Sequence, residues 1–162
     1  LALNPAAPTL CIALPGSLVF VAGQAEAGGS IAEATRNTLK SLEATLKSLG
    51  LSFADVISVR SFLSPMDQTG AAVEEIHKLH QGPQVVVEWL APGTIEIELV
   101  AASPNPPAEP EQRVEFLTPP GMQASPVYSR VARTYGTSLI FVSGLYGTSS
   151  RSGAEEVNQI FA

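Results

Sequence analysis

One apolar segment of the chain occurs twice with conservative changes. Residues 17–23 read Ser-Leu-Val-Phe-Val-Ala-Gly, and residues 138–144 read Ser-Leu-Ile-Phe-Val-Ser-Gly, an offset of 121 positions (138 − 17). Pro5 and Pro126 keep the same offset. A period this long is typical of a duplicated domain, because solenoid repeats are a few tens of residues long. The first copy continues through further elements and the second stops at Ala162, so we expect one complete unit and one truncated unit.

The start of the first unit predicts a hairpin followed by a helix. Apolar residues 10–14 and 18–21 flank Pro15-Gly16, a turn sequence, which predicts two paired strands. Ser30 and Glu33 form a capping-box sequence at a helix start. The helix carries an apolar face with 3- and 4-residue spacing, and Gly50 is suited to a left-handed end. That face consists of Leu39, Leu42, Leu46 and Leu49.

The rest of the unit predicts a strand, a second helix and two closing strands. The strand covers residues 56–63, the helix roughly 69–80, and the closing strands 85–87 and 95–100. This order is typical of an α+β fold, with a mixed sheet and two helices packed on one face. The side chains expected in its core are Leu39, Leu42, Leu46, Ile57, Val59, Ile76 and Leu79.

A proline-rich stretch separates this unit from the second copy. Residues 104–110 contain four prolines, so we expect domain 1–103, a stiff linker 104–112 and a second, incomplete unit 113–162. In the second unit, residues 114–117 are a candidate strand or edge, and a helix is expected from Gly153 onward. The apolar face of this incomplete unit must be buried. It can pack against the first unit's sheet, against another subunit, or against residues that are not part of this sequence. We favour a homo-oligomer.

Composition narrows the classes of function. The chain has 162 residues, 45% of them hydrophobic and 15% charged, as in a globular protein. A net charge of −6, with nine Lys and Arg residues, argues against nucleic-acid binding. The sequence shows no membrane-spanning run or leader, and Cys11 is the single cysteine; we expect a cytoplasmic protein without a disulfide. A start at Leu1 without Met indicates processing, trimming or excision from a longer chain.

Several motifs, in this order, resemble the RidA/YjgF family of imine deaminases, also described as L-PSP endoribonucleases. The run 18–24 resembles the family's strand ending in Ser-Gly-Gln, and 46–55 resembles its helix end followed by Gly and Asp-Val. Residues 95–101 resemble its closing Val-Glu-Ile-Glu-Ala-Ile-Ala, and 126–129 resemble its Pro-Tyr-Ser with one insertion. The resemblance covers the first unit almost completely and the second through its first helix.

The resemblance implies a chorismate-mutase-like fold assembled as a trimer, with small-molecule pockets between subunits. Well-known members hydrolyse reactive 2-imino acids without metal or cofactor. An Arg in a Pro-x-Arg-Ser motif holds the substrate carboxylate, a task that suits the two parallel donors of a guanidinium.

This chain departs from the family pattern at the residues that carry the chemistry. Residues 82–86 read Gly-Pro-Gln-Val-Val, and no Arg occurs between Arg60 and Arg113. Ala22 replaces the Ser of Ser-Gly-Gln, and His77 lies where the family has Asn-x-x-Tyr. We therefore expect little 2-imino acid hydrolysis from the first copy.

The ligand-binding candidates are Gln24, His77, Glu98, Tyr128 and Ser143. Gln24 follows the apolar strand, His77 could replace the family's pocket Tyr, and Glu98 is placed at the family's pocket glutamate. Tyr128 and Ser143 are the family residues retained in the second copy. For Glu98 the simpler interpretation is a solvent-facing strand residue.

The second helix also gathers ionisable residues. Glu74, Glu75, His77 and His80 could form half of a carboxylate-bridged metal site, but the first helix offers only Glu33 and Glu43 at its ends. A solvated helix surface is the favoured interpretation, so no metal site and no cofactor are predicted.

Two main hypotheses for function follow. The first is a RidA-like protein that binds a small imine, enamine or carboxylate at a domain or subunit interface without standard deaminase activity. The second is an active imine hydrolase whose site depends on residues of the second copy. An L-PSP-type endoribonuclease is a third alternative, disfavoured by the acidic charge.

Overall fold

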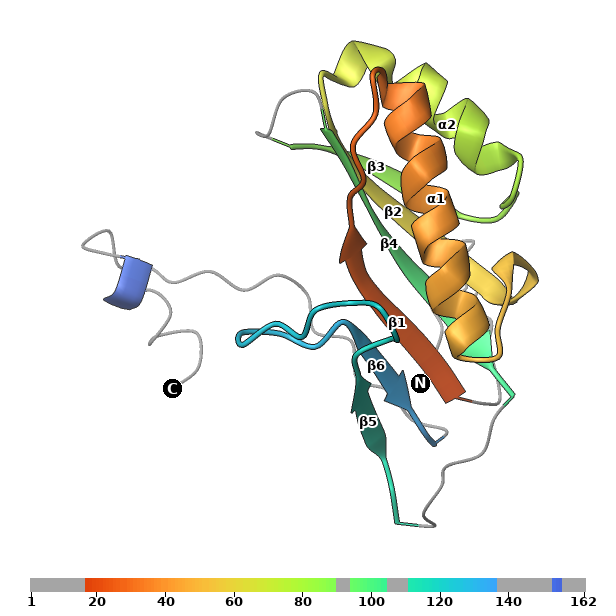
Figure 1. Ribbon diagram of the computed structural model, residues 1–162, viewed down its shortest axis with the longest axis vertical. Helices are drawn as coiled ribbons and strands as arrows, with labels where there is room; N and C mark the ends of the chain where they lie inside the picture. The colour runs from red at the N-terminus through yellow and green to blue at the C-terminus, as the bar shows by residue number, and fades with distance from the viewer. Residues whose placement is uncertain (1–16, 90–93, 105–110, 137–152, 156–162) are drawn as a thin grey trace, which may run out of the picture.

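The computed structural model describes residues 17–89, 94–104, 111–136 and 153–155. Their strands form one six-stranded sheet in the order β3-β2-β4-β1-β6-β5 (Figure 1). The pair β2–β3 is parallel, and the other four neighbouring pairs are antiparallel. The strands are β1 Ser17–Gln24, β2 Val56–Ser64, β3 Gln84–Glu88, β4 Thr94–Ser103, β5 Val114–Leu117 and β6 Val131–Thr134.

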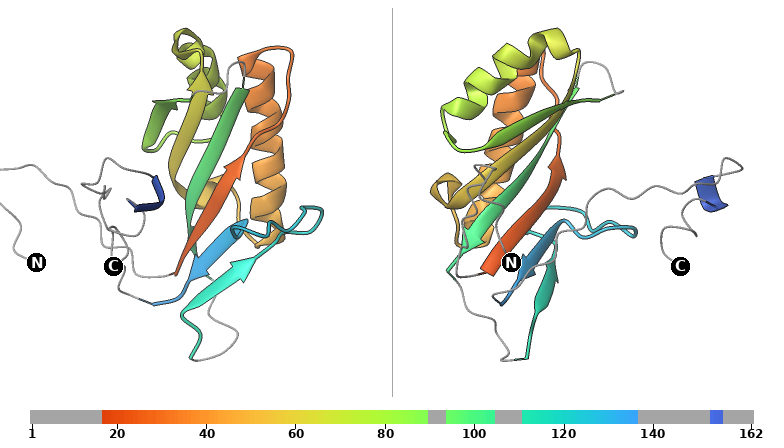
Figure 2. Two further views of the ribbon diagram at one scale, coloured as in Figure 1. Left: turned by 90° about the vertical axis from the view of Figure 1, so that its left-hand side faces the viewer. Right: turned by 180° about the vertical axis from the view of Figure 1, so that it is seen from behind.

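Two helices, α1 Ile31–Ser48 and α2 Thr69–His77, lie on one face of the sheet (Figure 2). The helix-covered face is called the inner face below, and the opposite face the outer face. The α+β class, with a mixed sheet and both helices on one face, is thus confirmed. The short 3₁₀ turns Phe53–Asp55 and Met66–Gln68 precede β2 and α2.

Helix α1 begins and ends through local interactions that its sequence specifies. The Ser30 hydroxyl accepts from the Glu33 backbone N–H at 3.2 Å, as a capping box requires. The Glu33 carboxylate, however, accepts from the Gly29 N–H rather than from that of Ser30. At the other end Gly50 has φ +72°, and the Leu51 N–H donates to the Leu46 carbonyl, which is a Schellman ending.

The core lies between α1, α2 and the inner face. Leu42, Leu46, Val59 and Ile76 have no exposed surface, and Leu39 is also buried, as expected. Ile57 is only half-buried, contrary to expectation. A register shift between Val56 and Ser58 lets two residues of β2 span one step of β4, so Val56 takes the buried position instead.

Leu79 is the second exception, with 46% of its surface exposed. A helix reaching residue 80 would place Leu79 on the same face as Ile76, but α2 ends at His77. Leu79 therefore follows the helix in a turn whose N–H groups bond back to Ile76, and its side chain lines a shallow groove between the helices.

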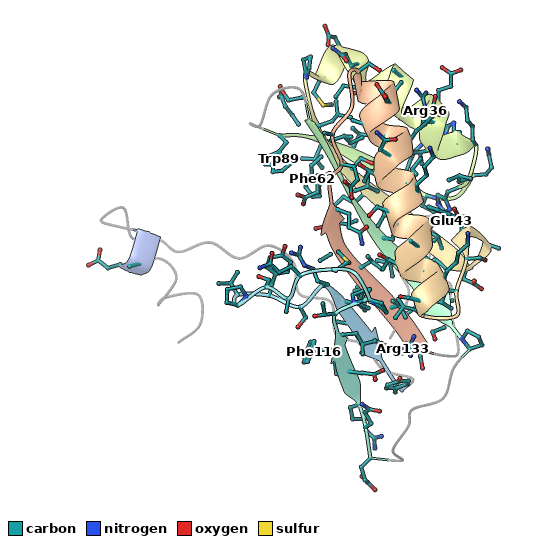
Figure 3. All side chains as sticks on the ribbon, in the orientation of Figure 1. Arg36, Glu43, Phe62, Trp89, Phe116 and Arg133 are labelled. Carbon is teal, nitrogen blue, oxygen red and sulfur yellow. The ribbon has the colours of Figure 1, made fainter. Side chains whose placement is uncertain are left out.

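The expected solvated surface on α2 is confirmed for Glu74 and His77, which are exposed, and is wrong for Glu75 and His80. Glu75 is buried and bonds to Arg36 of α1 and to Lys78, at 2.8 Å each. Arg36 extends from α1 beside α2 (Figure 3). His80 is buried too. The Lys78 hydrogen bond, together with Arg36, lowers the pKa of Glu75 against the opposing effect of burial. This ion-pair cluster ties the two helices together.

Strands from both sides of the proline-rich stretch share the sheet. The predicted strand 114–117 is present as β5, and β6, which lies in the expected second unit, pairs with β1. Val131 of β6 is fully buried, so within the described residues the first unit's sheet covers this part of the second copy. The predicted strands at 10–14 and 139–142 lie outside the described residues, and residues 153–155 are helical.

Across the ranges that the structure describes, no helix is long and apolar enough to cross a membrane. In the same ranges, no three His, Cys, Asp or Glu side chains gather closely enough to hold a metal ion.

Candidate functional site

The outer face of the sheet carries a hollow of about 420 Å³. Strands β1 to β4 form its floor, and residues of the second copy form one side. Side chains on the outer face of each strand line it, because successive residues in a strand point to opposite faces, and the intervening Val21 and Leu99 also border it. The lining residues are Phe20, Val21, Ala22, Ser58, Arg60, Val85, Glu98, Leu99, Val100, Ser129 and Ala132.

An ion pair supplies the charge in this hollow. Arg60 on β2 lies opposite Glu98 on β4, and Arg60 Nη1 is 3.3 Å from Glu98 Oε2. The two side chains are 59% and 35% exposed, so solvent weakens the attraction between them. A guanidinium has five N–H donors, and this contact uses one nitrogen. Arg60 therefore has capacity to bind an incoming anion in a largely apolar hollow.

A second carboxylate lies on the same face, two residues from Glu98. A Cβ on Gly23 would lie 2.0 Å from Glu96 Oε1, so a side chain at this position would force the Glu96 carboxylate to move. Burial, and secondarily the charge of Glu98, raises the pKa of Glu96. The outer face thus combines a cation, a carboxylate paired with it, and a carboxylate whose protonation is favoured.

Two of the predicted ligand-binding residues lie on the opposite side of the sheet. Gln24 is buried on the inner face, where its Nε2 donates to Thr45 Oγ1 of α1 at 2.9 Å. His77 lies at the end of α2, and its Nε2 is 2.6 Å from Gln84 Nε2. The structure does not bring these side chains into the hollow, and their role in binding stays a prediction.

Two other predicted ligand-binding residues, Glu98 and Tyr128, lie in or next to the hollow. Glu98 lies in the hollow, and Tyr128 lies in the segment before β6, next to Ser129 in the lining. The Arg130 guanidinium lies 4.9 Å from the centroid of the Tyr128 ring and donates to its hydroxyl. Ser143 lies outside the described residues.

Sequence reasoning missed Arg60 and Glu96. Both alternate with buried residues in their strands, a pattern that solvated residues share, so the periodicity gave no sign of their neighbours. One signal was available for Arg60. It is the last Arg before a stretch of 52 residues without one (residues 61–112), and the resemblance described above implies an Arg in the binding site.

Comparisons with known proteins agree with this architecture. The family model described as Endoribonuclease L-PSP matches residues 3–103. A member of the YjgF/YER057c/UK114 family from Mycobacterium tuberculosis is 30% identical over 54% of this chain and 80% of its own, with a TM-score of 0.51. No curated protein sequence matches the chain.

Two further solved structures show the same fold at lower identity. A YjgF-family protein from Neisseria meningitidis is 23% identical, over 55% of this chain and 82% of its own, with a TM-score of 0.50. The yeast protein YEO7 is 21% identical, over 61% of this chain and 91% of its own, with the same TM-score.

Proposed function

This chain belongs to the Endoribonuclease L-PSP (YjgF) family, and we propose that it binds a small carboxylate-bearing molecule in the outer-face hollow. The observation that carries the proposal is the Arg60–Glu98 pair in an otherwise largely apolar hollow. A guanidinium binds a carboxylate through parallel, charge-assisted hydrogen bonds, and apolar walls suit the rest of a small imine, enamine or carboxylic acid.

Arg60 lies beside the position where the family's Arg would fall. Counted from Pro83, the third residue of Pro-x-Arg-Ser is Val85, and Val85 is the register partner of Arg60 in the parallel pair β2–β3. Val85 is 53% exposed on the same outer face. A guanidinium on β2 can therefore reach part of the space that one on β3 would occupy. The guanidinium of Arg60 would, however, reach a bound carboxylate from β2 rather than from β3. This different direction argues against standard 2-imino acid deaminase activity.

Calorimetric titration with a panel of short 2-keto and 2-amino acids tests the binding site. Arg60→Gln should weaken binding about tenfold, because the charge-assisted hydrogen bonds would be lost. Lys40→Gln is the matched control: it removes the same charge from the exposed surface of α1, on the other side of the sheet, and should leave affinity unchanged. Equal effects of the two substitutions would contradict the proposal, since they would show a general charge effect.

An active imine deaminase is the second candidate, and one observation favours it: Ser129 of the second copy lines the hollow. In an assay coupled to an amino-acid oxidase that generates 2-imino acids, we expect little hydrolysis by the unmodified chain. Val85→Arg should raise the rate, whereas Gln84→Arg should not, because Gln84 faces His77 on the helix side. Strong activity in the unmodified chain would establish the second candidate.

Self-association is the remaining part of the proposal. Members of this family generally associate with themselves, and this chain exposes Val85, Val87, Val114 and Phe116 on the outer face. Burying such a face is favourable by roughly 25 cal/mol per Å², so we propose a homo-oligomer, trimer-like in packing, with the hollow at the subunit interface. Light scattering at low micromolar concentration tests it, and a monomer of 16.9 kDa would contradict it.

A further inference from the structure

A shallow groove lies between α1 and the turn that follows α2, on the side of the sheet opposite the hollow. Its volume is about 260 Å³, and it is open to solvent. Arg36 and Glu43, about two helical turns apart on α1, both line it (Figure 3). Pockets for small molecules usually measure about 300–1,000 Å³ and enclose most of the ligand. The size and open shape of this groove therefore suit side chains of a peptide better than a small molecule.

Two leucines give the groove an apolar surface. Leu39 of α1 is buried there, and Leu79, in the turn after α2, is 46% exposed. Leu79 is the most exposed leucine among the described residues. An apolar side chain placed against these two leucines would remove part of Leu79 from water, and the hydrophobic effect favours that contact.

One buried carboxylate holds two cations beside this apolar surface. Glu75 Oε1 accepts from Arg36 Nη1 and Glu75 Oε2 from Lys78 Nζ, each at 2.8 Å. The side chains of Arg36 and Lys78 are nevertheless 48% and 58% exposed. A guanidinium has five N–H donors and an ammonium three, so both groups keep donors for a further anion. Because Glu75 already orders both side chains, binding would cost them little conformational entropy.

The charge of the groove is opposite in sign to that of the whole chain. Its lining contains three cations and two carboxylates, a net charge of +1 (3 − 2), whereas the chain carries −6. Of the two carboxylates, Glu75 is buried, and Glu43 Oε1 is 3.1 Å from Lys47 Nζ, outside the lining. The screening length at physiological salt is about 8 Å, so a ligand in the groove responds mainly to these neighbours. The groove therefore complements an acidic partner.

We propose that this groove docks a short acidic segment of a partner protein. One apolar side chain of that segment packs against Leu39 and Leu79, and its carboxylates bind Arg36 and Lys78. The groove belongs to the helix layer, on the other side of the sheet from the hollow. The proposal is therefore independent of the ligand proposed for the hollow and of self-association through the outer face.

Fluorescence anisotropy with synthetic peptides tests this docking site on the full chain. The probe is a short fluorescein-labelled peptide with a central leucine between aspartates. Two comparison peptides replace the leucine by serine or the aspartates by lysines. We expect saturable binding of the probe with a dissociation constant below about 1 mM. The serine peptide should bind about fivefold more weakly, and the lysine peptide at least about tenfold more weakly.

Substitutions in the chain assign the binding to the groove. Lys78→Gln should weaken binding of the probe about threefold, because an exposed ionic contact is lost. Arg113→Gln is the matched control: it removes one positive charge from an exposed residue before β5, at the sheet edge opposite β3, and should leave binding unchanged. Leu79→Ala should weaken the leucine peptide about threefold and leave the serine peptide unchanged, a difference that a general loss of structure would not produce.

Several results would overturn the proposal. They are the absence of saturable binding up to about 1 mM probe, equal binding of the acidic and lysine peptides, equal effects of Lys78→Gln and Arg113→Gln, and equal effects of Leu79→Ala on the leucine and serine peptides. Circular dichroism verifies that each variant is folded. A salt series on the unmodified chain needs no substitution: raising salt from about 0.05 to 0.5 M should weaken binding of the probe severalfold, and an unchanged affinity would contradict ionic docking.

Discussion

Leu46→Ala should reduce the free energy of unfolding by about 3–4 kcal/mol. Leu46 belongs to α1 and has no exposed surface. The substitution removes three carbon atoms from the core, a transfer contribution of about 2.4 kcal/mol at about 0.8 kcal/mol per carbon. The remainder comes from the cavity, because the helices and sheet around Leu46 can only partly close it. The higher helix propensity of alanine returns only a few tenths of a kcal/mol.

Leu79→Ala removes the same atoms from a different environment and is the matched control. Leu79 is 46% exposed and lines an open groove, so about half of the transfer contribution is at stake and water fills the space. We expect a loss of about 1 kcal/mol. Urea unfolding, followed by circular dichroism at neutral pH, measures both variants.

The comparison would refute the assignment of the core in either of two ways. A loss below about 1 kcal/mol for Leu46→Ala would mean that the helix face is not packed as described. Equal losses for the two variants would mean that α2 extends beyond His77 and buries Leu79, as the periodicity alone suggests.

Two predictions concern pH. The pKa of Glu75 is lowered, first by the hydrogen bond from Lys78 and also by Arg36. Ionised Glu75 therefore stabilises the fold above the ordinary pKa of 4.5, and this stabilisation is lost as pH falls through the lowered pKa. The stability advantage of the unmodified chain over Glu75→Gln, measured by urea unfolding, should therefore shrink below pH 4.5. The pKa of Glu96 is raised, first by burial and then by the charge of Glu98. Protonated Glu96 therefore contributes to the stability of the fold below pH 4.5, and this contribution is lost as pH rises through the raised pKa. Glu96→Gln should be more stable than the unmodified chain at pH 7 and equal to it below pH 4.5; a destabilised variant at pH 7 would contradict this.

The sequence was sufficient for features that depend on near neighbours. Ser30, Gly50 and the leucine spacing of α1 specify the helix and both of its ends through contacts within a few residues. Strands β1 to β5 were recognisable from their local apolar patterns, whereas β6 was not predicted as a strand. Ile57 and Leu79 were misjudged because a shift in strand register and an early helix end each alter which side of the backbone faces the core.

The candidate site depends on neighbours that are distant in sequence, and periodicity does not encode them. Arg60 meets Glu98 across 38 residues, and Glu96 fits against Gly23 only because β1 and β4 are adjacent. Gln24 shows the converse: its place after the apolar strand suggested a ligand, yet its amide reaches Thr45 on the inner face. Which face a strand-end residue takes is decided by the register shift between Val21 and Gln24.

Strand β1 lies in the interior of the sheet, and both of its neighbours, β4 and β6, are synthesised after it. A chain elongates at about 5–20 residues per second. Strand β4 ends at Ser103, 79 residues after Gln24 (103 − 24), so β1 waits about 4–16 s for that neighbour. Strand β6 ends at Thr134, 110 residues after Gln24 (134 − 24), a delay of about 6–22 s. Strand β6 is therefore the later of the two neighbours of β1 to be synthesised, and the β1–β6 pairing can form only after β4 is available.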